Sequence, residues 1–168
     1  ASSPIPALPL VTARAFPNLK FRQPVEIRYN EVLNRFFVLE LEGLVYSFPP
    51  NELVEKADLV YDLRANIPEA SRAYGLEFHP DFAETGEVFF CYVLGRKIKD
   101  GTHVARYRIP KDDGPPRFDP GSREVLITWL SGGHNGGSLN FGKDGMLYIS
   151  TGDAEAPYPP DGLKTGQD

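Results

Sequence analysis

The chain has 168 residues, 41% hydrophobic and 24% charged, a balance that is ordinary for a folded globular protein and disfavours intrinsic disorder. Its net charge of −5, without the Lys/Arg cluster that a nucleic-acid partner requires, favours a small or neutral ligand. No apolar run reaches the roughly 18 residues of a membrane span, and the opening ASSPIPALPL has no signal-peptide pattern. The single cysteine, Cys91, excludes an internal disulfide within this sequence.

The composition favours a chain of short β-strands. Sixteen Gly, sixteen Pro and a 12% aromatic share are typical of all-β folds with many turns. Alternating or β-branched runs predict strands at Val25–Tyr29, Arg35–Leu41, Leu44–Phe48, Leu59–Leu63, Gly75–Phe78, Glu87–Val93, His103–Ile109, Glu124–Leu130, Gly137–Phe141 and Met146–Ser150. One helix of about two turns is predicted from Asn51 to Ala57, after two prolines.

Three segments repeat one pattern of an alternating strand, a polar turn and a stronger aromatic strand. They read VEIRYNEVLNRFFVLEL, GLEFHPDFAETGEVFFCYV and SLNFGKDGMLYISTG, at a spacing of roughly 50 to 60 residues. Four strands per repeat predict a β-propeller, with an extended segment over 1–20 and blades at about 21–66, 67–130 and an incomplete 131–168. Since a propeller closes with roughly four to eight blades, we expect a fragment. A β-sandwich of about ten strands is the alternative.

The segment LSGGHNGGSLNFGKDGMLYISTGD, from Leu130 to Asp153, is the part of the sequence best suited to chemistry. Four glycines surround His134 and Asn135, so a flat ligand could approach the backbone and the imidazole. Asp153 follows a predicted strand and could return to the same rim to orient the ring. The pattern predicts a proton acceptor and its carboxylate partner.

Each of these residues also has a purely structural interpretation. His134 could cap a glycine turn, Asp153 could close an Asx-turn, and Asn135 suits a left-handed loop position. The His79-Pro80-Asp81 sequence favours a turn over a ligand site. Cys91, inside an aromatic strand, is expected to be a buried and unreactive thiol.

Two motifs in this order carry a family resemblance: GLEFHPDF at Gly75–Phe82, and GGHNGGSLNFGKDGMLYISTGD at Gly132–Asp153, followed by the final GQD. Together they are similar to the glucose/sorbosone dehydrogenase family. That resemblance implies a six-bladed propeller that oxidises a sugar with pyrroloquinoline quinone (PQQ) and calcium. About two to three blades would lie in this chain.

The resemblance also implies roles for particular residues. His134 would act as the general base that takes the proton from the sugar's anomeric hydroxyl, while hydride passes to the quinone. Asp153 would fix the tautomer of the ring. Cofactor contacts would fall on Asn135, Gly136 and Arg72, and no metal ligand is expected in this chain. The implied partners are a sugar and an electron acceptor such as a cytochrome or a dye, in a periplasmic or secreted setting.

Two departures from the family pattern keep other functions open. Ala70-Ser71-Arg72 replaces a polar residue and two glycines, and Ser138 replaces an arginine. The residues that would hold most of the cofactor belong to later blades, so this chain alone is expected to be inactive. One alternative is a non-catalytic propeller that binds a protein or a carbohydrate. Another is a metal-dependent, lactonase-like propeller, for which only Asp153 is well placed.

Overall fold

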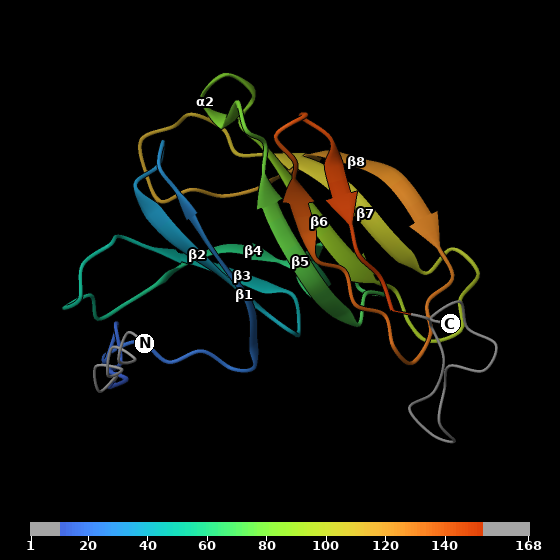
Figure 1. The fold of residues 1–168 in the computed structure, drawn as a ribbon, viewed down its shortest axis with the longest axis horizontal. Helices are drawn as coiled ribbons and strands as arrows, with labels where there is room; N and C mark the ends of the chain where they lie inside the picture. Colours follow the sequence, from blue (N-terminus) through green and yellow to red (C-terminus); the bar gives the residue numbers. More distant parts are fainter. Residues whose placement is uncertain (1–10, 153–168) are drawn as a thin grey trace, which may run out of the picture.

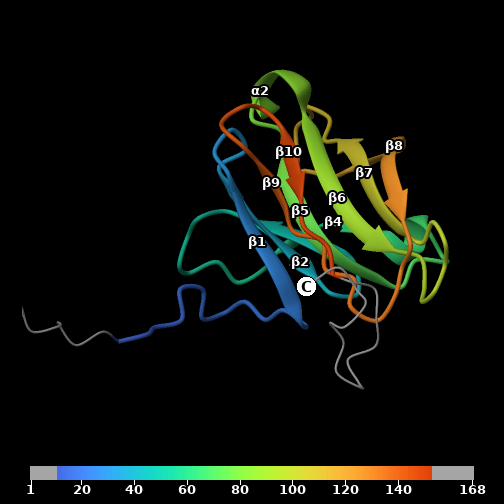
Figure 2. The same cartoon turned by 45° about the vertical axis from the view of Figure 1, so that its right-hand side comes forward.

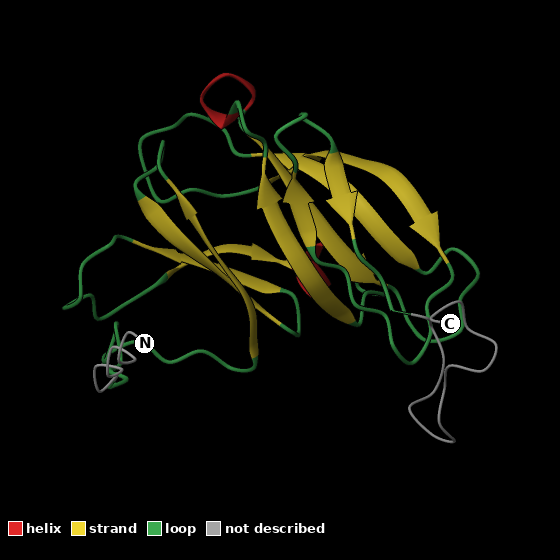
Figure 3. Ribbon diagram, viewed as in Figure 1, coloured by secondary structure: helices red, strands yellow, loops and turns green. Residues whose placement is uncertain are grey.

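The computed structural model describes residues 11–152, which form three antiparallel β-sheets in succession along the chain (Figures 1 and 3). The first sheet contains β1 (Pro24–Asn30), β2 (Arg35–Glu40), β3 (Leu44–Phe48) and β4 (Asp58–Asp62). The second contains β5 (Arg72–Phe78), β6 (Glu87–Val93), β7 (Thr102–Arg108) and β8 (Asp119–Trp129), and the third is a hairpin of β9 (Leu139–Phe141) and β10 (Leu147–Ile149). Within each sheet, strands that are consecutive in the sequence pair with one another.

The first strands of the three sheets lie side by side. β1 contacts β5, and β5 contacts β9 (Figures 1 and 2). Arg28 of β1 bridges all three strands: its Nε donates to the carbonyl of Leu76 at 3.0 Å, and its Nη2 donates to that of Leu139 at 2.9 Å. Such an arrangement is that of blades around a propeller axis, so the predicted all-β propeller is confirmed, with two blades and the first hairpin of a third.

The main core lies between the first two sheets. β6 is buried along its whole length because both of its faces are covered. Val88, Phe90 and Tyr92 pack with the first sheet in the main cluster, whereas Phe89 and Cys91 pack toward β9 and β10 in a second cluster. Because both faces of β6 are packed against other residues, its sequence is a continuous apolar run rather than an alternation of apolar and polar residues.

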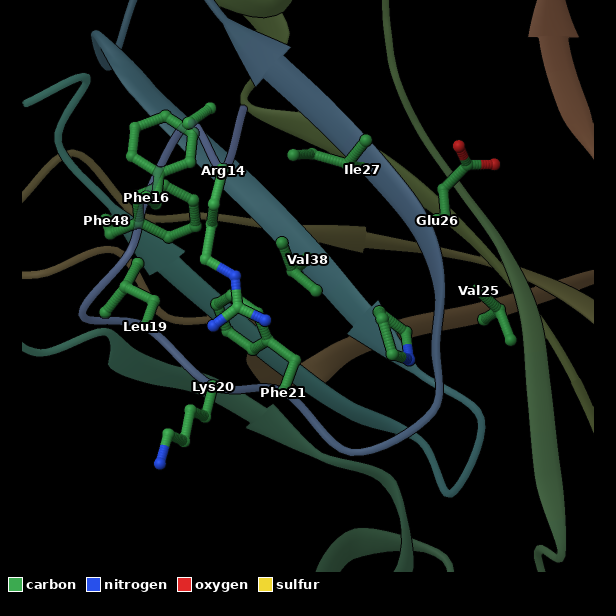
Figure 4. Close-up of a pocket in the computed structure, with 12 residues that line it drawn as sticks. Arg14, Phe16, Leu19, Lys20, Phe21, Val25, Glu26, Ile27, Val38 and Phe48 are labelled. Carbon is green, nitrogen blue, oxygen red and sulfur yellow. The ribbon is translucent and has the colours of Figure 1, made fainter. Parts of the chain in front are cut away.

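The outer face of the first sheet carries a groove of about 800 Å³ (Figure 4). Phe16, Leu19 and Phe21 from the segment before β1 pack there against Val38 and Phe48 of the sheet. The segment therefore covers part of a sheet face that would otherwise be bare.

Antiparallel pairing sends alternate connections to two opposite rims of the sheets. One rim carries residues 63–71, 94–101 and 130–138, and we call it the glycine-loop rim. The other carries residues 79–86 and 109–118, and we call it the α2 rim after the one-turn helix α2 (Phe82–Thr85) (Figure 1). The candidate site lies on the first of these rims.

The predicted helix from Asn51 to Ala57 is wrong. Residues 51–57 form a turn and irregular chain, in which the Asn51 side chain accepts a hydrogen bond from the amide of Leu53 at 2.9 Å. This local bond competes with a helical hydrogen bond, and the segment is too short to offset the free-energy cost of helix nucleation. Val54 and Ala57 pack against the outer cluster of the first sheet instead.

Two one-turn helices were not predicted from the sequence. In α1 (Leu63–Asn66), the side chain of Asp62 caps the N-terminus by accepting from the amide of Ala65 at 3.0 Å. α2 ends at Gly86, whose φ of 64° is left-handed. Among residues 11–152, no helix has the length and apolar character to cross a membrane.

Candidate active site

His134 lies in the middle of the loop that joins β8 to β9, which we call the glycine loop (residues 130–138). The side chain of Asn135 locks this loop from inside. Its Oδ1 accepts from the amide of Gly132 at 2.7 Å, and its Nδ2 donates to the carbonyl of Gly132 at 3.0 Å. Asn135 is buried and His134 is half-buried. The backbone that carries the imidazole is therefore held in place by the Asn135 side chain.

The strand end after β10 is bonded directly to the glycine loop. The amide of Gly152 donates to the carbonyl of Asn135 at 2.7 Å, and the Thr151 hydroxyl donates to the same oxygen at 3.0 Å. The indole of Trp129 in turn donates to the Thr151 hydroxyl at 3.1 Å. These contacts join the end of β8, the loop and the segment after β10 into one unit.

Gly152 is required where it packs on the loop. A Cβ at this position would lie 2.3 Å from the carbonyl oxygen of His134, which is backbone and has little room to move. Asp153 follows Gly152 in the sequence and lies outside the described residues. Its role as partner of His134 therefore stays a prediction.

The underside of the glycine loop rests on β5 and β6. Gly137 has a φ of 136°, and a Cβ there would lie 2.5 Å from the Cys91 sulfur. Gly75 of β5 approaches so closely that its Cβ would lie 2.0 Å from the Gly137 carbonyl oxygen. Burial raises the pKa of Cys91 to about 12, so this residue is a protonated thiol packed under the loop.

Arg28 fixes the strand that leaves the glycine loop. Besides its two bonds to backbone carbonyls, its guanidinium is 3.3 Å from the Glu26 carboxylate and 3.4 Å from that of Glu77. It also donates to Asn140 of β9 at 3.2 Å. Burial raises the pKa of Glu77, although the nearby Arg28 acts in the opposite direction.

The structure brings some of the predicted site residues together and leaves another apart. His134, Asn135 and Gly136 share the glycine loop, with Gly136 exposed and left-handed at a φ of 63°. Arg72 begins β5, where its guanidinium lies 3.8 Å from the carboxylate of Glu42. A cofactor contact through the Asn135 amide would compete with both of its bonds to Gly132, so the cofactor roles of these residues stay predictions.

His79 and Asp81 form a turn on the α2 rim, away from His134. The Nδ1 of His79 accepts from the amide of Asp81 at 3.0 Å, and its ring packs on Phe89 and Phe141. Within residues 11–152, no group of three or more His, Cys, Asp or Glu side chains is placed to hold a metal ion.

Sequence reasoning missed Thr151, Arg28 and the indole bond of Trp129 as supports of the site. Thr151 was visible only as part of the STGD motif, and Arg28 as one polar residue of an alternating strand. Their contacts join residues far apart in the chain, and strand periodicity holds no signal for such pairs.

A family model described as glucose/sorbosone dehydrogenase matches residues 30–167, which is most of the chain. The chain belongs to the glucose/sorbosone dehydrogenase family. Its recognition from the two motifs is therefore confirmed. The match includes the three sheets from the end of β1 onward and the whole glycine loop.

Relatives of this glucose/sorbosone dehydrogenase family member include two proteins named for an interaction with Hedgehog. The Hedgehog-interacting proteins of Mus musculus and Homo sapiens are 29% and 28% identical over 148 and 147 residues, which is 79% of this chain. The chain spans only 21% of the length of either relative.

Solved structures share the fold. The PQQ-bound form of an aldose sugar dehydrogenase from Streptomyces coelicolor matches 80% of this chain and 39% of its own, with a TM-score of 0.64 and 17% identity. A glucose dehydrogenase matches with a TM-score of 0.55 and 22% identity, over 79% of this chain and 38% of its own. At these identities the likeness establishes a shared propeller architecture.

Proposed function

We propose that this chain is part of an oxidoreductase that oxidises an aldose or a related sugar by hydride transfer to PQQ. The observation that carries the proposal is the half-buried imidazole of His134, held on a glycine loop that Asn135 locks from within. Membership of the glucose/sorbosone dehydrogenase family and the fold of a PQQ-bound aldose sugar dehydrogenase support it. Because the chain spans a minor part of its relatives, the activity is proposed for the whole protein.

In this proposal His134 takes the proton from the sugar hydroxyl as the C–H bond gives up its hydride, which leaves a C=O group. Histidine is the side chain that most often performs this task near neutral pH. Asp153 orients the ring and stabilises the imidazolium, in the manner of the carboxylate in a catalytic triad. The Asn135 and Gly152 contact supports this pairing, because it ties the residue before Asp153 to the loop.

The residues present fit one side of a flat quinone. Gly133 and Gly136, which flank His134 and Asn135 in the sequence, are exposed and have no side chains, and Arg72 is a half-exposed cation at the start of β5. When bound, the quinone would supply the hydride acceptor. Arg72 would contribute charge to its carboxylates, at the expense of the ion pair with Glu42. Calcium, a periplasmic or secreted location and the electron acceptor are further parts of the proposal, supported by the family resemblance alone.

Calorimetry and turnover test this function in the full-length protein. We expect PQQ to bind in the presence of calcium, and the loaded protein to reduce a redox dye when given an aldose. A panel of neutral aldoses would identify the substrate. Absence of quinone binding, or quinone binding without turnover on any sugar of the panel, would contradict the proposal.

A second function, a propeller that binds another protein, is favoured by one observation. The two Hedgehog-interacting proteins that match this chain are named for a protein partner. Ser138, which replaces the arginine of the family pattern, is exposed at the end of the glycine loop. A protein that binds no quinone but retains a specific protein ligand in a pull-down would support this function over the enzyme.

A further inference from the structure

The β6–β7 connection (residues 94–101), which we call the basic loop, places three cations on the glycine-loop rim. Arg96, Lys97 and Lys99 are all exposed. Within the described part of the chain, none of the three forms an ion pair, whereas other arginines such as Arg28 and Arg35 do. With Asp100, whose carboxylate accepts a bond from the Thr128 hydroxyl, the loop still carries a net positive charge on a chain whose net charge is −5.

Hydrogen bonds fasten the basic loop to the start of the glycine loop. The amide of Lys97 donates to the carbonyl of Ser131 at 2.9 Å, and the amide of Ile98 donates to the Ser131 hydroxyl at 3.1 Å. The amide of Ser131 donates back to the carbonyl of Ile98 at 3.0 Å. Ser131 is fully buried and lies three residues before His134, so the basic loop and the glycine loop lie on one rim (Figure 2).

The conformation of the basic loop is held rather than free. A Cβ at Gly101 would lie 2.4 Å from the Ser131 hydroxyl and 2.7 Å from the Cβ of Ile98, so the turn closes tightly on both residues. Lys97 has a φ of 58°, a left-handed conformation that costs about 1 kcal/mol or more in a residue with a side chain. The hydrogen bonds of the turn thus fix the backbone point from which the Lys97 side chain extends.

The arrangement suits an anion that arrives from solvent and touches the rim briefly. The three side chains lie on an open surface, and small-molecule sites are usually concave and enclosed. A net local charge raises the encounter rate of oppositely charged partners, even where it adds little affinity. Three charges on one turn are also far fewer than a nucleic-acid surface needs.

We propose that the basic loop recruits anionic electron acceptors to the rim that carries His134. The inference rests on the proposed dehydrogenase function. Each sugar oxidised releases two electrons and two protons. A one-electron anionic acceptor takes the electrons in two encounters, and the protons leave to solvent.

Acceptor kinetics test the proposal in the full-length, quinone-loaded protein. We would measure the second-order rate constant for anionic ferricyanide and for cationic phenazine methosulfate, at saturating sugar and a range of salt concentrations. The test variant carries Arg96→Glu, Lys97→Glu and Lys99→Glu. The control carries Lys111→Glu, Arg117→Glu and Lys143→Glu, an equal charge change at exposed positions on the α2 rim.

We expect the test variant to lose at least about tenfold in the ferricyanide rate at low salt and little at high salt, where charges are screened. Its phenazine rate should stay the same or rise, and the control should keep both rates. Equal losses for both acceptors, or an unchanged ferricyanide rate, would overturn the proposal. If the Glu variant folds poorly, a variant with Gln at the same three positions replaces it. With half the charge change, it should lose ferricyanide rate to a smaller extent and keep its phenazine rate.

Fluorescence quenching provides a readout that needs no turnover. Trp129 is half-buried two residues before Ser131, and a Trp129→Phe protein isolates its signal by difference. We expect iodide to quench Trp129 more strongly than caesium at low salt, and the triple Glu variant to reverse that order. Equal quenching by both ions would contradict a positive rim. A wild-type protein that shows the iodide preference but reduces no acceptor would refute the dehydrogenase function and leave the positive rim standing.

Discussion

At the scale of single residues, His103 differs from His79 in its hydrogen-bond partners, and His103 links folding to pH. His103 lies at the start of β7, where its Nε2 bonds the carbonyl of Asp100 at 2.9 Å and its Nδ1 lies 3.2 Å from the Tyr92 hydroxyl. Arg123 donates to that same hydroxyl at 2.8 Å. Burial lowers the pKa of His103, and the nearby Arg123 adds to this effect.

A lowered pKa of His103 in the folded state makes stability depend on pH. Below the ordinary histidine pKa of about 6.5, the unfolded chain binds a proton more readily than the folded one. The free energy of unfolding should therefore fall as the pH drops from 7.5 toward 5.5, and it should fall less in His103→Gln. Denaturant unfolding at several pH values measures this, and parallel curves for the two proteins would show that the residue is not linked to folding.

Thr151 is a positioning residue whose hydroxyl links Trp129 to the glycine loop. Thr151→Val keeps the shape and removes the hydroxyl, so both bonds are lost, each worth about 1 kcal/mol. We expect kcat to fall by roughly three- to tenfold, and the Trp129 emission to shift as its indole loses its acceptor. Thr151→Ser should restore both properties. A normal kcat in the valine variant would show that the loop is held without this link.

At the scale of the elements, the strands were predictable and their mutual contacts were not. Leu44–Phe48 and Glu87–Val93 have the predicted limits, because strand signals lie within a few residues. β8 begins at Asp119, five residues before the predicted Glu124, since its first residues are polar and exposed. The glycine loop was recognisable as a site, but its attachment to the basic loop and to Arg28 depends on pairs distant in sequence.

Close packing between β5 and the glycine loop leaves no room for a side chain at Gly75. In Gly75→Ala, the new methyl group would overlap the carbonyl oxygen of Gly137, which must then move. We expect the free energy of unfolding to fall by about 1–3 kcal/mol. Gly114→Ala is the control, because a Cβ there has nothing within 4 Å. Equal stability of the two variants in denaturant unfolding would contradict the close approach of these strands.

At the scale of the whole molecule, the described residues form one sector of a propeller, and its two rims differ in character. The α2 rim carries the His79 turn, whereas the glycine-loop rim carries the loop of His134 and the basic loop bonded to it. The chain covers 39% or less of the length of the two solved structures and two relatives compared above. Family and fold were accessible from two motifs. The activity could not be predicted from these motifs, because proteins named for an interaction with Hedgehog are similar to the same stretch of sequence.

The most direct test of the account compares one substitution at two histidines in the full-length, quinone-loaded protein. His134→Asn removes the proposed base. His79→Asn, on the α2 rim, keeps an oxygen that can accept the amide of Asp81, as Nδ1 does now. The account predicts that kcat/KM for an aldose falls at least about a hundredfold in His134→Asn and stays near the wild-type value in His79→Asn. Wild-type turnover in His134→Asn would contradict it.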